Sequence, residues 1–216
     1  MNTYTKQELL NLYNKPLTEL IEISHKITED NFANSVEACS IVSAKTGACN
    51  ENCKYCAQSK HNHADIECHP LLDVDTVKKA ALSAKENGAN HFCIVTSGTA
   101  PTRKDFENIL KMVKEVASID GLHCCASLGL LSEDEIKELK NAGLERYNHN
   151  INTSENYHKN ICSTHNFEDR VHTVEMIKKH GIEACCGVII GMGESREDRI
   201  DMALSLKKLN PKTVPI

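Results

Sequence analysis

The sequence predicts an α/β fold, namely a (β/α)8 TIM-type barrel with about five and a half βα units present and helices in front of it. Apolar, strand-like stretches alternate with amphipathic, helix-like stretches. The strands recur roughly every 25 to 35 residues, which is the period of βα units in a parallel sheet or barrel. A complete barrel needs about 250 residues, and this chain of 216 residues stops in an apolar stretch. We therefore expect the barrel to be incomplete at its carboxyl end.

Two regions are expected, an N-terminal helical extension over residues 1–34 and the incomplete barrel over residues 35–216. In the extension, Thr5 and Glu8 have the spacing of a capping box, and Pro16 suits the first turn of a second helix. In the barrel, Asp75 and Ser132 are the expected N-caps of two helices. The barrel strands are expected at 38–42, 91–96, 123–128, 146–152, 183–190 and 213–216, and the barrel helices at 76–87, 105–118, 132–143, 166–180 and 195–209.

Composition excludes several classes of protein. The net charge is −5 and no long basic run occurs, so a nucleic-acid partner is not expected. Residues 1–15 contain no apolar core of a signal peptide, and no stretch approaches the length of a membrane span. The eleven cysteines are an odd number in a chain without an export signal. We therefore expect reduced thiols and metal ligands in the cytoplasm, not a disulfide framework.

Three of these cysteines, Cys49, Cys53 and Cys56, form a C-x3-C-x2-C motif directly after an apolar run. We call them the triplet cysteines. Iron–sulfur clusters are usually held by four cysteines, and structural zinc sites also take four ligands. A triplet therefore favours a cluster with one exchangeable iron. A zinc knuckle completed by His61 or His63 is the alternative that the spacing leaves open.

The triplet, with Tyr55 just before its last cysteine, resembles the signature of the radical S-adenosylmethionine (SAM) superfamily. This resemblance implies a [4Fe–4S] cluster whose open iron is chelated by SAM, with Tyr55 beside the cofactor. It further implies that reduction cleaves SAM to methionine and a 5′-deoxyadenosyl radical.

Three more cysteines, Cys93, Cys125 and Cys185, lie on separate expected strands. We call them the barrel cysteines. A single cysteine is often a small buried hydrophobe. Three at corresponding positions of one barrel can instead point inward and meet. The residues alone leave both interpretations open.

Over residues 32–216 the chain resembles the biotin synthase family, a branch of the radical SAM superfamily. The matching stretches are 45–49, 56–58, 92–93, 125–129, 141–144, 147–154, 187–194 and 211–216. This resemblance implies conversion of dethiobiotin to biotin, in which carbon–sulfur bonds replace two unactivated C–H bonds. It implies that the barrel cysteines bind an auxiliary iron–sulfur cluster, [2Fe–2S] or larger, which donates the sulfur. An electron donor such as flavodoxin or ferredoxin and a homodimer are further implications.

The resemblance also implies roles for single residues. Asn148 and Asn150 are expected at the boundary between dethiobiotin and SAM, and Asn150 is expected to contact both. Asn152, where the family usually has Asp, is expected at the SAM ribose, and Ile189 beside the adenine.

Three features depart from the family. His91 stands where many relatives have Arg, and an arginine ligand from a later strand would lie beyond Ile216. Cysteine doublets at 124–125 and 185–186 place one member of each on either face of a strand, so Cys124 and Cys186 are expected to face the helices. We also consider that Cys186 turns inward and joins an enlarged auxiliary cluster. Cys68 and Cys162 are expected to have no role, and His149 to pack near the site without binding metal.

Two other functions are considered. One is a different radical SAM barrel enzyme, of the hydrogenase-maturase or mutase type. The other is an inactive fragment that only binds metal.

Overall fold

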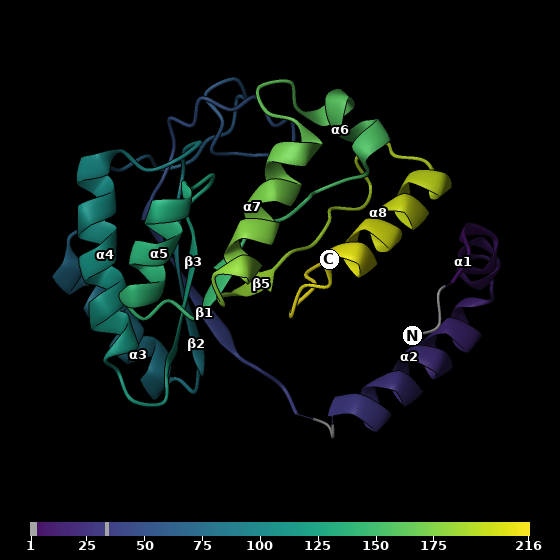
Figure 1. Cartoon of the computed structure of the whole chain (residues 1–216), viewed down its shortest axis with the longest axis horizontal. Helices are drawn as coiled ribbons and strands as arrows, with labels where there is room; N and C mark the ends of the chain where they lie inside the picture. Colours follow the sequence, from purple (N-terminus) through teal and green to yellow (C-terminus); the bar gives the residue numbers. More distant parts are fainter. Residues whose placement is uncertain (1–3, 33–34) are drawn as a thin grey trace.

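The structure, a computed structural model, describes residues 4–32 and 35–216. Five parallel strands form one sheet in the order β1-β2-β3-β4-β5, so each strand pairs with its successor along the chain (Figure 1). The predicted α/β fold with a partial TIM-type barrel is thus confirmed. The strands are β1 (Cys39–Lys45), β2 (His91–Thr96), β3 (His123–Ser127), β4 (Arg146–Asn148) and β5 (Glu183–Cys185).

Helices that follow the strands along the chain cover the outer face of this sheet. Phe92 and Ile94 of β2 point to this side and meet an apolar stripe of α4, which includes Phe106 and Ile109. All four side chains are essentially buried, and each stabilises the fold by about 2 kcal/mol. The helices are α1 (Lys6–Tyr13), α2 (Leu17–Phe32), α3 (Val74–Glu86), α4 (Arg103–Ala117), α5 (Glu133–Asn141), α6 (Glu155–Ile161), α7 (Phe167–Lys179) and α8 (Arg196–Leu209).

Helix caps were predicted with mixed success. The capping boxes at Thr5 and Ser132 are present, with Glu8 and Glu135 completing them. Asp75 is wrong as the N-cap of α3. The cap is Asp73, whose carboxylate accepts a 2.8 Å hydrogen bond from the Thr76 backbone N–H, so the helix begins two residues earlier.

Several strands are shorter than predicted. β4 ends at Asn148, and the chain then turns through Asn152, whose φ of +66° is incompatible with a continuous strand. β5 ends at Cys185, and beyond it the predicted strand 183–190 makes only an isolated bridge between Val188 and Asn152. The expected strand at 213–216 forms one bridge, from Thr213 to Cys185. Helix α6 was not predicted.

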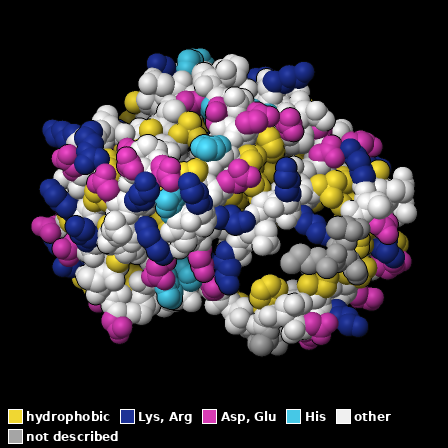
Figure 2. All heavy atoms as spheres, viewed as in Figure 1, with side chains coloured by type: hydrophobic (Ala, Val, Ile, Leu, Met, Phe, Trp, Pro, Cys, Tyr) yellow, Lys and Arg dark blue, Asp and Glu magenta, His cyan; other side chains and the backbone are white. Residues whose placement is uncertain are grey.

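The N-terminal helices lie apart from the sheet and reach the barrel through α1 (Figure 1). Lys6 of α1 forms a 2.8 Å ion pair with Asp201 of α8, and Tyr13 accepts a hydrogen bond from Arg199. Helix α2 buries none of its side chains, and hydrophobic atoms show at its edge in Figure 2. The boundary between extension and barrel at residues 34 and 35 stays a prediction. Among the described residues, no helix is long and apolar enough to cross a membrane.

Candidate cluster and cofactor site

The triplet cysteines lie on a tight loop that follows β1. The loop opens with left-handed backbone at Gly47 (φ +75°) and Ala48 (φ +54°), a conformation that glycine adopts without strain. Further along, the Asn62 side-chain amide donates to the backbone carbonyls of Cys53 (2.9 Å) and Cys56 (2.8 Å). One side chain therefore fixes the spacing between two of the three cysteines.

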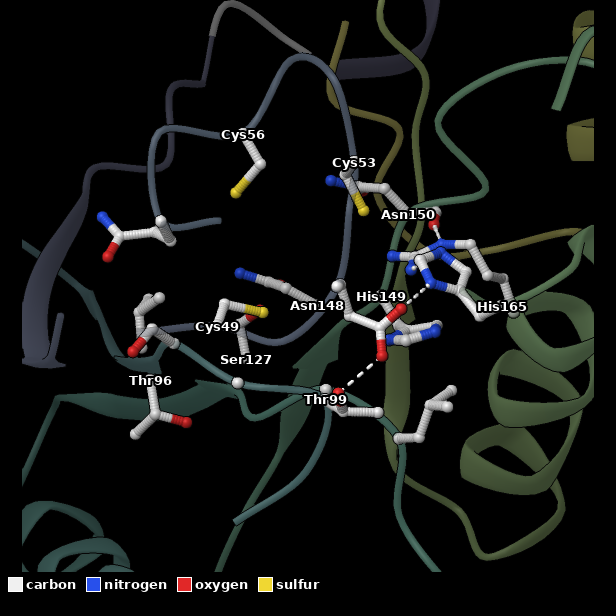
Figure 3. A pocket seen from close by; sticks show the side chains of 18 of the residues that line it. Cys49, Cys53, Cys56, Thr96, Thr99, Ser127, Asn148, His149, Asn150 and His165 are labelled. Carbon is white, nitrogen blue, oxygen red and sulfur yellow. Dashed lines mark hydrogen bonds and ion pairs between the residues drawn. The ribbon is translucent and has the colours of Figure 1, made fainter. Parts of the chain in front are cut away.

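The three thiols point from this loop into a shared cavity at the carboxyl ends of the strands (Figure 3). Cys49 and Cys53 are each only 7% exposed. The cavity has a volume of about 240 Å³ and opens to solvent at its mouth. Its walls come from the triplet loop, from the ends of β2, β3 and β4, and from His165 and Arg170 further along the chain.

The donor set fits a multi-iron cluster better than a single ion. In the part of the chain that the structure describes, the one group of three or more His, Cys, Asp or Glu residues whose ligand atoms all lie within 4.8 Å of one another is Cys53, Cys162 and His165. The triplet sulfurs are therefore too widely spaced to share one ion, whereas a cubane takes one thiolate on each of three irons. His61 and His63 do not join such a group either, so the geometry gives the zinc knuckle no support.

Cys53 depends on a metal for its thiolate. Burial, reinforced by the neighbouring thiol of Cys162, raises the pKa of Cys53 to about 12. A metal binds the deprotonated sulfur and releases the proton. The site is thus arranged to keep a neutral thiol until iron arrives.

The barrel cysteines lie on the inner face of the sheet. Cys93 and Cys125 are direct partners in the β2–β3 register, and Cys185 pairs with Asn148. All three are buried, yet none belongs to the apolar core under the helices. Burial raises the pKa of Cys93 and Cys185. The structure thus brings three neutral thiols to one side of the sheet, which is one of the two arrangements that the residues left open; their binding of a cluster stays a prediction.

The second members of the doublets lie on the other face. Cys124 and Cys186 are fully buried and both belong to the apolar core with the helices. Cys186 donates its backbone N–H to Thr213 and continues the strand direction past β5. This is the default arrangement expected from the alternation of side chains along a strand.

Cys39 on β1 is a fourth thiol at the barrel cysteines. Interaction with the Cys125 thiol lowers the pKa of Cys39 to about 7, and the same interaction raises the pKa of Cys125. The buried guanidinium of Arg146 lies close enough to lower the pKa of Cys39 further, and it is held by ion pairs of 3.1 Å to Glu37 and to Glu183.

Comparisons with known proteins identify the family. The family model described as "Radical SAM superfamily" matches residues 44–206 of this chain. The chain belongs to the radical SAM superfamily. Its relatives include the biotin synthase of Aquifex aeolicus, 46% identical over 91% of this chain and 60% of that protein, and that of Francisella tularensis, 42% identical over 98% of this chain and 68% of that protein. The chain therefore spans between three fifths and about two thirds of the length of these curated relatives.

Solved structures agree on the fold. A methylornithine synthase superposes with a TM-score of 0.87 at 20% identity, over 99% of this chain and 64% of its own. The FeFe-hydrogenase maturase of Carboxydothermus hydrogenoformans superposes with a TM-score of 0.81 at 16% identity, over 99% of this chain and 52% of its own. Membership of the superfamily implies a [4Fe–4S] cluster and SAM; that the triplet cysteines bind them stays a prediction.

The residues predicted to contact SAM and substrate divide into two groups. Tyr55, Asn148 and Asn150 line the cavity. Asn152 and Ile189 lie outside its walls, where the Ile189 backbone N–H donates to the Asn152 carbonyl at 2.8 Å. The Nδ2 atom of Asn152 is buried and has no hydrogen-bond partner among the described atoms. The roles of all five stay predictions.

Other residues reach the site from distant parts of the chain, and no sequence pattern indicated them. Glu51, His165 and Arg170 line the cavity, and His165 lies 2.6 Å from the Glu51 carboxylate. Cys162 was expected to have no role, but it is 4% exposed and lies 3.7 Å from Cys53, sulfur to sulfur. Nothing in the sequence indicates this contact, because more than a hundred residues separate the two cysteines and no local pattern links them; whether Cys162 has a role stays open to test. His149 lines the cavity as a buried residue whose burial holds its pKa well below the usual range.

Proposed function

We propose that this chain is part of a radical SAM sulfurtransferase that inserts sulfur into dethiobiotin to form biotin. The proposal rests on the names of its relatives and on one feature of the structure, the placement of the barrel cysteines directly beneath the cavity. Because the chain spans only part of those relatives, the activity of the whole enzyme is the proposal.

The strand geometry supports this placement. Val95 and Ser127 line the cavity and are register partners, as Cys93 and Cys125 are. Each cysteine precedes its cavity residue by two positions, so it lies on the same face and ~7 Å deeper. A ligand on the cavity floor would stand one layer of side chains from two of the three barrel sulfurs.

Asn148 connects the cavity with the barrel cysteines beneath it. It lines the cavity, and its side-chain amide donates a 3.3 Å hydrogen bond to the Cys93 sulfur. A substrate with ureido oxygen and nitrogen atoms, such as dethiobiotin, would find both a donor and an acceptor in this amide. The same contact keeps the amide directed toward the sulfur that we assign to the auxiliary cluster.

The residues that line the cavity, above the layer of the barrel cysteines, have side chains that can bind SAM. When bound, the [4Fe–4S] cluster and SAM together supply the 5′-deoxyadenosyl radical that unactivated C–H bonds require. Arg170 carries the one guanidinium or ammonium group among the residues that line the cavity, and it would pair with the SAM carboxylate. Asn150 is held by the Gly187 backbone N–H, which donates to its side-chain oxygen at 2.8 Å, leaving its amide N–H groups available to the ligand.

The auxiliary cluster would take the barrel cysteines and act as sulfur donor, as a [2Fe–2S] or larger cluster. Cys39 is better placed than Cys186 to add a thiolate, because Cys39 lies near enough to Cys125 to shift the pKa of that thiol, whereas Cys186 lies in the apolar core. Flavodoxin or ferredoxin as electron donor, and a homodimer, are part of the same proposal.

The test is anaerobic incubation of the reconstituted chain with dethiobiotin, SAM and dithionite. Mass spectrometry should find a product heavier than dethiobiotin by one sulfur and lighter by two hydrogens. Release of 5′-deoxyadenosine without this product would contradict sulfur insertion and favour another radical SAM reaction. A preparation with bound zinc and no labile sulfide would contradict sulfur insertion and any other radical SAM reaction alike.

A further inference from the structure

The triplet loop is clamped by a segment more than a hundred residues away. Residues 161–165, which we call the clamp segment, join the end of α6 to the start of α7. Lys54 donates its backbone N–H to the carbonyl of Ile161 at 2.9 Å. The Asn52 side chain accepts from the Ser163 backbone N–H at 2.9 Å and donates to the Ser163 hydroxyl at 2.7 Å.

A second set of contacts fixes the far end of the clamp segment. His165 lies with Nδ1 2.6 Å from a Glu51 carboxylate oxygen, and the Thr164 hydroxyl donates to the same carboxylate. On the other side of the ring, Arg170 lies 3.2 Å from His165 Nε2. Because a guanidinium can only donate, Nε2 accepts and Nδ1 carries the proton toward Glu51.

Between these two anchors, the Cys162 thiol is pressed against Cys53. The two sulfurs are 3.7 Å apart, and both residues are almost fully buried. Cys162 also has the Asn52 carbonyl oxygen at 3.4 Å, the Thr164 hydroxyl at 3.4 Å and His165 Nδ1 at 3.3 Å. The thiol is therefore held in place on several sides. Because His165 Nδ1 carries its own proton, the thiol hydrogen can turn toward the Asn52 oxygen, the Thr164 oxygen or the Cys53 sulfur.

Iron at Cys53 changes which acceptor is best. As a free thiol, Cys53 is itself a donor; as a cluster ligand it has lost its proton and can only accept. The Asn52 oxygen already accepts from Ser163. A charged sulfur is a stronger acceptor than a neutral amide oxygen that is already engaged.

We infer that, in the cluster-loaded protein, the Cys162 thiol donates a hydrogen bond to the Cys53 sulfur and raises the reduction potential of the [4Fe–4S] cluster. This rests on the cluster of the proposed function but not on its substrate. One electron enters the cluster on reduction, and the proton stays on Cys162. Hydrogen bonds to cluster sulfurs stabilise the more negative, reduced state, and they are one of the determinants of cluster potentials. Cys162 is thus a positioning residue that acts through Cys53.

The test compares Cys162→Ala, which removes the donor, with Cys162→Ser, which keeps one. The full chain is reconstituted without SAM and titrated with dithionite, and the EPR signal of the reduced cluster is read; the signal is assigned by its loss in Cys56→Ala. For Cys162→Ala we expect about a tenfold lower ratio of reduced to oxidised cluster at fixed potential, equivalent to ~59 mV for a one-electron couple. Cys162→Ser and the wild type should agree within about twofold, since a hydroxyl also donates.

Cys124→Ala is the matched control, because it removes an equally buried thiol from the helix-facing core. It should leave the ratio unchanged. An unchanged ratio in Cys162→Ala, or the same drop in Cys162→Ser as in Cys162→Ala, would overturn the inference, the second by showing a packing effect. A lower iron content in Cys162→Ala than in Cys124→Ala would also overturn it, by making Cys162 a ligand.

A measurement on the wild type keeps the inference testable even where the alanine variant does not fold. Electron–nuclear double resonance of the reduced cluster in D2O should show a strongly coupled exchangeable deuteron that Cys162→Ser retains. Its absence from the wild type would overturn the inference and leave the proposed function intact. Failure of the wild type to assemble any cluster would overturn both.

Discussion

Glu194 closes the glycine-rich stretch that is expected to pass the adenine of SAM, and its carboxylate folds back on that stretch. One oxygen accepts from the Gly191 backbone N–H at 2.8 Å and from Arg199 Nε at 2.8 Å, and the other accepts from the Met192 N–H at 2.7 Å. The side chain is fully buried. Burial disfavours its charge, but these donors outweigh burial and lower the pKa of Glu194 to about 2.

The free energy that this carboxylate contributes can be worked out from its pKa. A carboxyl whose pKa falls from 4.5 to about 2 on folding would stabilise the folded state by ~3 kcal/mol at neutral pH. Because the loop lies near the surface, where solvent and salt screen charges, we expect about 2 kcal/mol. The folded-state pKa is the lower one, so the contribution is complete above about pH 4.5 and is lost as the pH falls through about 2.

We predict that Glu194→Gln lowers the free energy of unfolding by about 2 kcal/mol at pH 7, and that the difference from wild type shrinks to about 1 kcal/mol at pH 3. Urea unfolding of the cluster-free chain at both pH values measures this. Glu197→Gln is the control, since Glu197 lies exposed in the first turn of α8, the helix that follows Glu194. A difference that is the same at pH 3 as at pH 7 would refute the electrostatic origin.

Three further predictions concern the cysteines. Alanine at any one of the triplet cysteines should abolish 5′-deoxyadenosine release under reducing, anaerobic conditions, because two thiolates cannot hold a cubane with a unique open iron; wild-type release from any of them would contradict the cluster assignment. Alanine at any one of the barrel cysteines should preserve part of that release but eliminate biotin and lower the iron and sulfide content; unchanged biotin from all three would make them core residues. Cys186→Ser should leave the Mössbauer spectrum of the auxiliary cluster unchanged, and a changed spectrum would place Cys186 among its ligands.

The sequence was sufficient where the chemistry is local or periodic. The triplet cysteines fall within eight residues, and the alternation along β2 and β3 places Cys93 and Cys125 on one face. The sequence was insufficient where a side chain contacts a residue that is distant in the sequence and is brought near only by folding. Nothing near Cys162 in the sequence indicates Cys53, and the residue types after Asn148 do not reveal that β4 ends there and that the chain takes left-handed backbone at Asn152.

The clamp segment also explains from which side the triplet loop can be approached. Ile161 and Cys162 pack against Cys53 and close one side of the loop. Asn62 closes another side of the loop, because its side-chain amide donates hydrogen bonds to the carbonyls of Cys53 and Cys56. The cavity is the approach at which all three thiols and Arg170 are present together. A zwitterionic ligand entering there would bring its carboxylate to a guanidinium and its remaining donor atoms to the iron that no cysteine covers, which is the arrangement that SAM chemistry at this loop requires.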